Sequence, residues 1–121
     1  MDISLAPEMK PLHKALYCCY LALLLLETVH SFRHTIGVGE WHSCALLQGC
    51  ALKCWGRNTE GQLGYGDTKS RGLVPEDMGA ALPIVDLGTD RCAVSIALGN
   101  LHTCALLDNG AVKCWGENNK G

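Results

Sequence analysis

Few aromatic residues and no strong charge bias limit what this 121-residue chain can be. It has three Trp, three Tyr and one Phe, and its formal net charge is −2. A chain this close to neutrality offers no basic surface for nucleic acid, so we expect no nucleic-acid partner. It also has no long hydrophobic run, because the longest begins at Ala15 and ends at Leu26. These twelve residues fall short of the roughly 20 that a membrane-spanning helix needs.

The short apolar run has the length of a secretory signal core, which is about 7–15 residues. Its flanks fit a signal less well, because the preceding segment is not clearly basic and no small-residue cleavage site follows Leu26. Three interpretations of residues 1–33 stay open: an imperfect signal or membrane anchor, a buried amphipathic helix, or a leader foreign to the rest. We expect a short hydrophobic helix here, with membrane contact through residues 15–26.

Glycine and cysteine, by contrast, are abundant, with 14 and 8 residues. Many glycines favour tight turns over long helices. Dense cysteine indicates disulfides and an oxidising compartment, although buried free cysteine is the alternative. The composition therefore favours a secretory or membrane-associated protein, with the cytoplasm as the alternative location.

A block of 26 residues occurs twice, sixty positions apart, at residues 36–61 and 96–121. Aligned without a gap, 14 of the 26 positions are identical. A repeat at fixed spacing indicates a unit that buries its apolar faces against neighbouring units. The second copy stops at Gly121, where the first continues, so we expect a piece of a longer array. We divide it into a first repeat at 34–93 and a truncated second repeat at 94–121.

Alternating apolar positions predict short strands at residues 93–98, 102–107 and 111–115, joined as an antiparallel meander. Asp108, Asn109 and Gly110 form the second connection, where Gly110 suits a left-handed backbone. We also expect a surface connection at residues 75–83 with a single helical turn, and a short edge strand at residues 84–87.

A three-residue turn fixes the register of the second hairpin. If Leu107 faces Ala111, then counting outward places Cys104 directly opposite Cys114. The expected Cα separation of about 4.5 Å in a non-hydrogen-bonded pair permits a cross-strand disulfide.

The first copy has Cys44 and Cys54 at the same spacing but a different turn. Cys50 replaces the left-handed glycine, so a two-residue turn that begins at Gly49 and shifts the register by one is the alternative. The pair Cys44 and Cys54 is therefore the less secure candidate disulfide. Cys50 and Cys92 have no counterpart in the other copy, and we expect them to be free and buried or paired outside this chain.

The strings HTCAL, then Gly110, then VKCWG of the second copy resemble the regulator of chromosome condensation repeat. The first copy matches it with HSCAL at 42–46, KCWG at 53–56 and GQLG at 61–64. The resemblance covers roughly residues 34–121. Members of that family are seven-bladed β-propellers with four-stranded blades. The resemblance implies an all-β fold: a partial β-propeller of about one and a half to two blades.

The resemblance also implies structural roles for repeated residues: glycine for turns, His and Trp for packing between blades, and Gln-Leu-Gly for the loop between blades. The residues that carry these roles are His42, His102, Trp55, Trp115, Gly56, Gly116, Gly61, Gly64 and Gly110.

Chemically suggestive residues recur in both copies, which argues against a catalytic site. His42 with Cys44, and His102 with Cys104, match no usual zinc spacing. The loop at 61–68 lacks the lysine of a phosphate-binding loop. We therefore expect no enzyme, no metal and no cofactor, and predict a non-catalytic protein-interaction module with an unidentified protein partner. Family analogy alone gives two alternatives: a guanine-nucleotide exchange factor for a small GTPase, and a secreted or cell-surface binding propeller.

Overall fold

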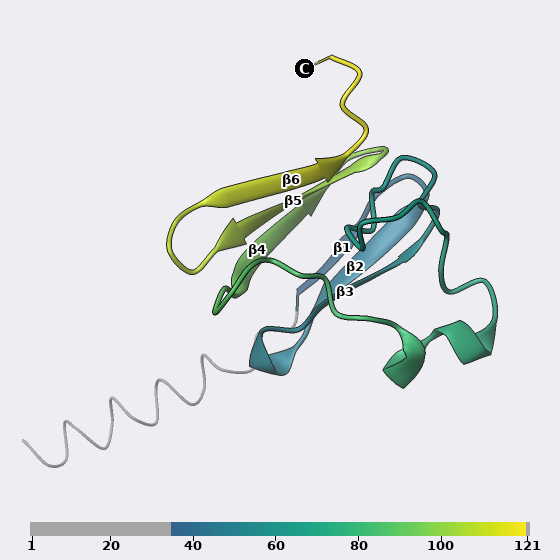
Figure 1. The fold of residues 1–121 in the computed structure, drawn as a ribbon, viewed down its shortest axis with the longest axis horizontal. Helices are drawn as coiled ribbons and strands as arrows, with labels where there is room; N and C mark the ends of the chain where they lie inside the picture. The colour runs from purple at the N-terminus through teal and green to yellow at the C-terminus, as the bar shows by residue number, and fades with distance from the viewer. Residues whose placement is uncertain (1–34, 121) are drawn as a thin grey trace, which may run out of the picture. The chain divides into compact units, whose positions relative to one another are not determined.

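The computed structural model describes residues 35–120, which form two antiparallel three-stranded sheets (Figure 1). The first sheet has the order β1-β2-β3 and the second has the order β4-β5-β6. The strands of the first sheet are β1 (Thr35–Val38), β2 (His42–Leu46) and β3 (Leu52–Gly56). The strands of the second sheet are β4 (Ala93–Leu98), β5 (His102–Leu107) and β6 (Val112–Gly116). The all-β class and the two repeated meanders are thus confirmed.

The second hairpin has the register that its turn predicts. Leu107 N–H donates to the Ala111 carbonyl over 2.8 Å, and Gly110 has a φ of 83°. Cys104 then pairs with Cys114 across the ladder. The chemistry of the turn is therefore sufficient to set every pair in β5 and β6.

The first hairpin keeps the same register despite its different turn. The 3₁₀ turn η2 (Gln48–Cys50) has two left-handed residues, Gly49 at a φ of 75° and Cys50 at 68°. Leu47 N–H donates to the Ala51 carbonyl over 2.8 Å, which makes a three-residue loop as in the second copy. The alternative of a two-residue turn with a shifted register is wrong.

The connection between the sheets contains two 3₁₀ turns, η3 (Pro75–Asp77) and η4 (Gly79–Ala81). The expected edge strand at residues 84–87 is wrong, since these residues do not form a strand. Val85 N–H donates to the Leu52 carbonyl over 2.8 Å, while the side chains of Val85 and Leu87 are buried. The segment alternates like a strand because it covers the core, not because it extends a sheet.

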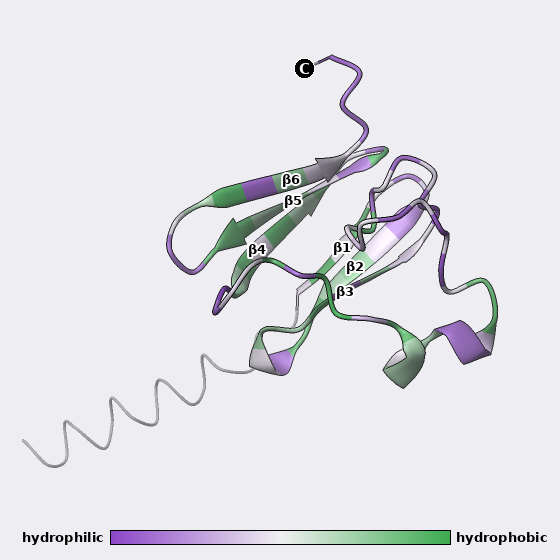
Figure 2. Ribbon diagram, in the orientation of Figure 1, coloured by the Kyte–Doolittle hydropathy of each residue, from purple (hydrophilic) through white to green (hydrophobic). Residues whose placement is uncertain are grey.

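Hydrophobic residues are frequent in the strands and in the segment that covers them, whereas the C-terminal tail is hydrophilic (Figure 2). The core draws on both sheets and on the connection between them. Its buried members are Cys44, Leu46, Leu52, Cys54, Leu63, Val85, Leu87, Ala93, Ala105 and Leu107.

The expected N-terminal segment, residues 1–33 with its short hydrophobic helix, lies outside the described residues. Among the helices of residues 35–120, none has the length and apolar character needed to cross a bilayer. The domain boundaries at residues 33, 93 and 121 stay predictions.

Candidate functional site: the joint between the two repeats

The side chain of His42 occupies a space that a glycine leaves open. A Cβ built on Gly39 would lie 2.6 Å from His42 Cε1, so only glycine lets the β1–β2 turn pass this close to the imidazole. Gly99 and His102 repeat the arrangement, with a Cβ on Gly99 falling 2.6 Å from His102 Nε2. The two histidines differ in burial: His42 is 3% exposed, whereas His102 is exposed. The second sheet covers the first histidine, and the described residues leave the second uncovered.

We call the interface between the two repeats the joint. The side chain of His42 forms a hydrogen bond across it to a residue 61 positions away. Its Nε2 lies 2.8 Å from Thr103 Oγ1, and the Thr103 hydroxyl donates to the Gln62 carbonyl over 2.8 Å. A hydroxyl has a single proton to donate, so the proton in the first of these bonds must come from His42 Nε2. His42 therefore has its proton on Nε2, and Nδ1 is an acceptor without a partner among the described residues.

This environment opposes a charged imidazole. Burial, and after it the electrostatic interaction with His102, lower the pKa of His42 from its ordinary value of 6.5. A second proton on His42 would place a cation in a joint with no described carboxylate bonded to it. The geometry thus uses His42 as a neutral hydrogen-bond donor.

Trp115 completes the joint from β6. Its indole Nε1–H donates to the same Gln62 carbonyl over 3.0 Å. Gly64 makes room for the ring, because a Cβ there would lie 2.6 Å from Trp115 Nε1. Two residues of the second repeat, Thr103 and Trp115, therefore bind one carbonyl in the loop of the first.

Hydrophobic contact supports these polar contacts between β1 and β4. A Cβ on Gly37 would lie 2.6 Å from Leu98 Cδ1 and 3.4 Å from Ile96 Cδ1. In the first repeat, the residues that match Ile96 and Leu98 are Ile36 and Val38, and both are exposed. The same sequence positions are thus packed in one repeat and open in the other.

The loop that supplies the Gln62 carbonyl is organised by the buried side chain of Asn58. Its Nδ2 donates to the carbonyls of Asp67 and Lys69 over 3.0 Å each, and its Oδ1 accepts Leu63 N–H over 2.9 Å. This role of Asn58 was not predicted from the sequence. The only indication in the sequence was the position of Asn58 in a run of polar turn residues that is followed by the apolar Leu63.

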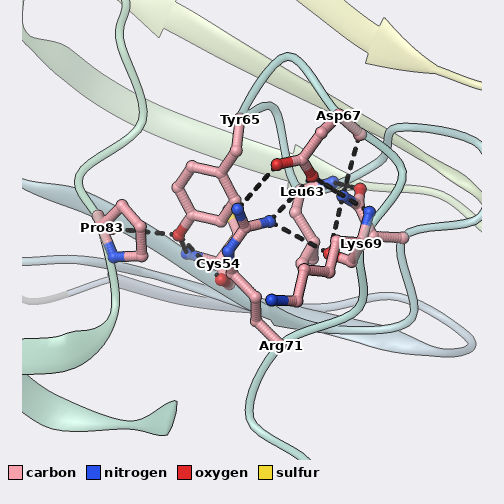
Figure 3. A network of polar contacts seen from close by, with 8 residues as sticks. Cys54, Leu63, Tyr65, Asp67, Lys69, Arg71 and Pro83 are labelled. Atoms are coloured by element: carbon pink, nitrogen blue, oxygen red, sulfur yellow. Dashed lines mark hydrogen bonds and ion pairs between the residues drawn. The ribbon is translucent and has the colours of Figure 1, made fainter.

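A second polar network closes the other side of this loop (Figure 3). Arg71 makes two bonds to the Asp67 carboxylate, at 2.9 and 2.8 Å, and its guanidinium lies 4.5 Å from the centroid of the Tyr65 ring. The hydrogen bond from Arg71 lowers the pKa of Asp67 to about 2. The Tyr65 hydroxyl accepts Cys54 N–H over 2.9 Å, which ties the loop to β3. The spacing of Tyr65, Asp67 and Arg71 in the sequence did not indicate this network.

The described cysteines form three disulfide pairs. Cys104 pairs with Cys114, and Cys44 pairs with Cys54, each with a Cα separation of 4.1 Å. The expectation that Cys50 and Cys92 are free or paired outside the chain is wrong, because they pair with each other across a Cα separation of 4.9 Å. Neither has a cysteine at the matching position of the other repeat, so the repeat could not indicate their proximity.

The remaining predicted structural residues lie at turns and on the outer faces. Gly56 and Gly116 have φ values of 110° and 108°, and a Cβ on Gly56 would lie 2.6 Å from the Trp41 carbonyl oxygen. Gly61 has a φ of 77° beside the Asn58 network. Trp55 packs beside Gly72 in its own repeat, whereas Trp115 packs across the joint.

Beside the joint is an open hollow of about 370 Å³. Asp67, Asp86 and Lys113 line it together with the glycine loop, and Lys113 Nζ is already bonded to the Leu87 carbonyl over 2.6 Å. All six cysteines within residues 35–120 are in disulfides, and no group of three metal-ligating side chains occurs in that range.

Comparison with known proteins identifies the repeat. Models described as the regulator of chromosome condensation (RCC1) repeat match residues 34–62, 54–106 and 93–121. The chain belongs to the RCC1-repeat family. It is 41% identical over 80 residues to the Protein RCC2 homolog of Danio rerio. This alignment covers 66% of this chain and 14% of the relative. It is also 31% identical over 86 residues to the probable E3 ubiquitin-protein ligase HERC4 of Homo sapiens, covering 71% and 8%.

Solved structures agree with the family. Yeast RCC1 (Prp20), solved bound to Kap60, matches with a TM-score of 0.50 and 26% identity over 72% of this chain and 20% of that one. Human WBSCR16 matches with a TM-score of 0.51 and 25% identity over 69% and 20%. The chain thus has the RCC1-repeat propeller fold, and it spans about a seventh of the curated RCC2 relatives it matches.

Proposed function

We propose that this RCC1-repeat chain is a non-catalytic protein-binding module whose partner contacts its loops. The observation that carries the proposal is that most of the chemically suggestive groups serve the scaffold. His42 bonds across the joint, the described cysteines are bonded in pairs, and Trp115 bonds to the Gln62 carbonyl. Repeats of this kind present loops on a rigid frame, and loops are where binding residues concentrate.

Relatives supply two partners to test. The structure of yeast Prp20p is described together with its binding to Gsp1p and to histones. The chain would be immobilised and exposed to a purified small GTPase of the Gsp1p kind and, separately, to histone dimers. Binding that falls when the exposed loop residues Arg57 and Glu60 are exchanged in charge (Arg57→Glu, Glu60→Lys) supports a loop-mediated contact. Binding unaffected by both changes would place the contact elsewhere and overturn that part of the proposal.

A second assay with the same GTPase separates binding from nucleotide exchange, the alternative that rests on family analogy. Release of a fluorescent guanine nucleotide from the GTPase would be followed with and without the chain. We expect no acceleration at saturating chain. A release rate that rises with chain concentration would replace the binding module by an exchange factor.

The disulfides favour a secreted or cell-surface protein as a second candidate, because cytosolic proteins rarely keep structural disulfides. Mass spectrometry of freshly isolated protein under non-reducing conditions tests this location. Free thiols at Cys104 and Cys114 would exclude it and leave the cytoplasmic alternative.

A further inference from the structure

We propose that the Cys50–Cys92 disulfide is a redox-modification site, which a dithiol reductant opens to release one repeat from the other. This disulfide is the only described one that crosses between the sheets, because the other two pairs lie within single hairpins. Cys50 is in the η2 turn at the end of the first hairpin, and Cys92 directly precedes β4. The proposal is independent of any partner bound by the loops.

Cys50 has a left-handed backbone at a turn position where the second repeat has glycine. It has a φ of 68° at the position where the second hairpin has Gly110 with a φ of 83°. Glycine adopts this conformation without steric cost, whereas other residues do not. The left-handed backbone therefore has a conformational free-energy cost at Cys50, which the bond to Cys92 offsets.

Exposure separates this disulfide from the one beside it. Cys44 and Cys54 are 0% exposed in the core. Cys50 is exposed and Cys92 is half-buried, so an attacking thiolate can approach the Cys50 sulfur. Cys114 and Cys104 are exposed and half-buried in the same way, but their bond lies within one hairpin, so its reduction does not part the repeats. Thiol–disulfide exchange requires such access to the attacked sulfur.

The chemistry is an ordinary two-step exchange with a dithiol. One thiolate of the reductant attacks Cys50 Sγ, the bond between the two cysteines breaks, and Cys92 leaves as a thiolate that takes up a proton. The second thiol of the reductant then displaces Cys50. The reductant ends as a disulfide, and its two hydrogens end on Cys50 and Cys92.

The structural consequence follows from where the disulfide lies. The joint is held at one end by this bond and at the other by the contact between His42 and Thr103. Reduction leaves the polar end intact and frees the first residues of β4, which Cys92 precedes. The sheets should then separate from the Cys50 end, with loosening that declines along β4 toward Leu98, where Leu98 packs on Gly37.

Graded reduction of the oxidised full chain tests the order of opening. Dithiothreitol would be added in steps, thiols would be trapped by alkylation, and each cysteine would be assigned by peptide mass spectrometry. We expect Cys50 and Cys92 to be alkylated at least about tenfold faster than Cys44 and Cys54, because access governs the rate. Equal or slower modification of Cys50 and Cys92 would overturn the proposal.

Hydrogen exchange then tests the release itself on the partly reduced wild-type chain, which has already folded with the bond in place. Amide protection should fall most at residues 93–95 and least at Leu98. The variant Cys104→Ser/Cys114→Ser is the matched control, because it removes a disulfide within one sheet and should loosen the β5–β6 hairpin instead. Unchanged exchange in β4, or loosening spread evenly along it, would show that the bond does not hold the repeats together.

Discussion

His42 and Thr103, 61 residues apart, are joined by a 2.8 Å hydrogen bond between Nε2 and Oγ1. Thr103 is fully buried, and its hydroxyl donates a hydrogen bond to the Gln62 carbonyl. A single hydroxyl therefore satisfies one donor and one acceptor from the first repeat. The joint depends on the second repeat through this group more than through any charged contact.

Replacing Thr103 by valine tests this dependence. Thr103→Val keeps the shape but leaves His42 Nε2–H without its acceptor, and an unpaired buried group costs about 1–3 kcal/mol. We expect a loss of that size in the free energy of unfolding, measured by urea denaturation. Thr103→Ser keeps the hydroxyl and should lose less. Ser43 is the counterpart of Thr103 in the first repeat and lies outside the joint, so Ser43→Ala is the control. A loss equal to that of Thr103→Val would contradict the interpretation.

Acid should weaken the joint in a defined pH range. Because the folded state lowers the pKa of His42, it favours the neutral form relative to the unfolded chain. The stabilisation is present above the unfolded pKa of about 6.5 and is lost as the pH falls below that value toward the folded pKa. Unfolding measured at pH 7.5 and at pH 5 should show this loss, and His42→Gln should flatten it. His102→Gln alters an exposed imidazole, so a flattening as large as that of His42→Gln would show that the wrong histidine was identified.

The second hairpin could be predicted from sequence because short-range chemistry determines it. Asp108, Asn109 and Gly110 set the turn, and counting from the turn places Cys104 opposite Cys114. The repeat then carried the same pairing to Cys44 and Cys54 despite the altered turn. Local turn geometry and period-two alternation contain this information.

The joint could not be predicted in the same way. Cys50 and Cys92 are 42 residues apart and have no cysteine at the matching positions of the other repeat, so no spacing rule connects them. Thr103 and Gln62 carry polar side chains of kinds that are usually exposed. Val85 shows the converse error: its alternating pattern arises from covering the core, and alternation alone does not distinguish this from strand pairing.

Two neighbouring glycines separate backbone strain from crowding at the joint. Gly64 and Gly66 have φ values of 78° and 77°, but only Gly64 faces Trp115, since nothing lies within 4 Å of a Cβ on Gly66. Gly66→Ala should cost about 1–2 kcal/mol from the left-handed backbone alone. Gly64→Ala should cost more, and it should shift Trp115 fluorescence as the indole moves from the Gln62 carbonyl. Equal losses in urea denaturation would mean that the ring yields freely.

The disulfide between the repeats should stabilise the chain more than a disulfide within one hairpin. The Cys50–Cys92 bond has a sequence separation of 42, and the Cys104–Cys114 bond has one of 10. The chain entropy that these loops remove from the unfolded state corresponds to about 4 and about 2.7 kcal/mol. Cys50→Ser/Cys92→Ser should therefore lower the free energy of unfolding more than Cys104→Ser/Cys114→Ser.

A third variant isolates the backbone contribution at Cys50. Cys50→Gly/Cys92→Ser lacks the same bond but restores the residue that the second hairpin has at this left-handed position. It should recover about 1 kcal/mol relative to Cys50→Ser/Cys92→Ser, because glycine adopts a positive φ without steric cost. If the two variants are equally stable, the left-handed conformation of Cys50 is lost when the bond is removed, and the disulfide itself imposes that turn.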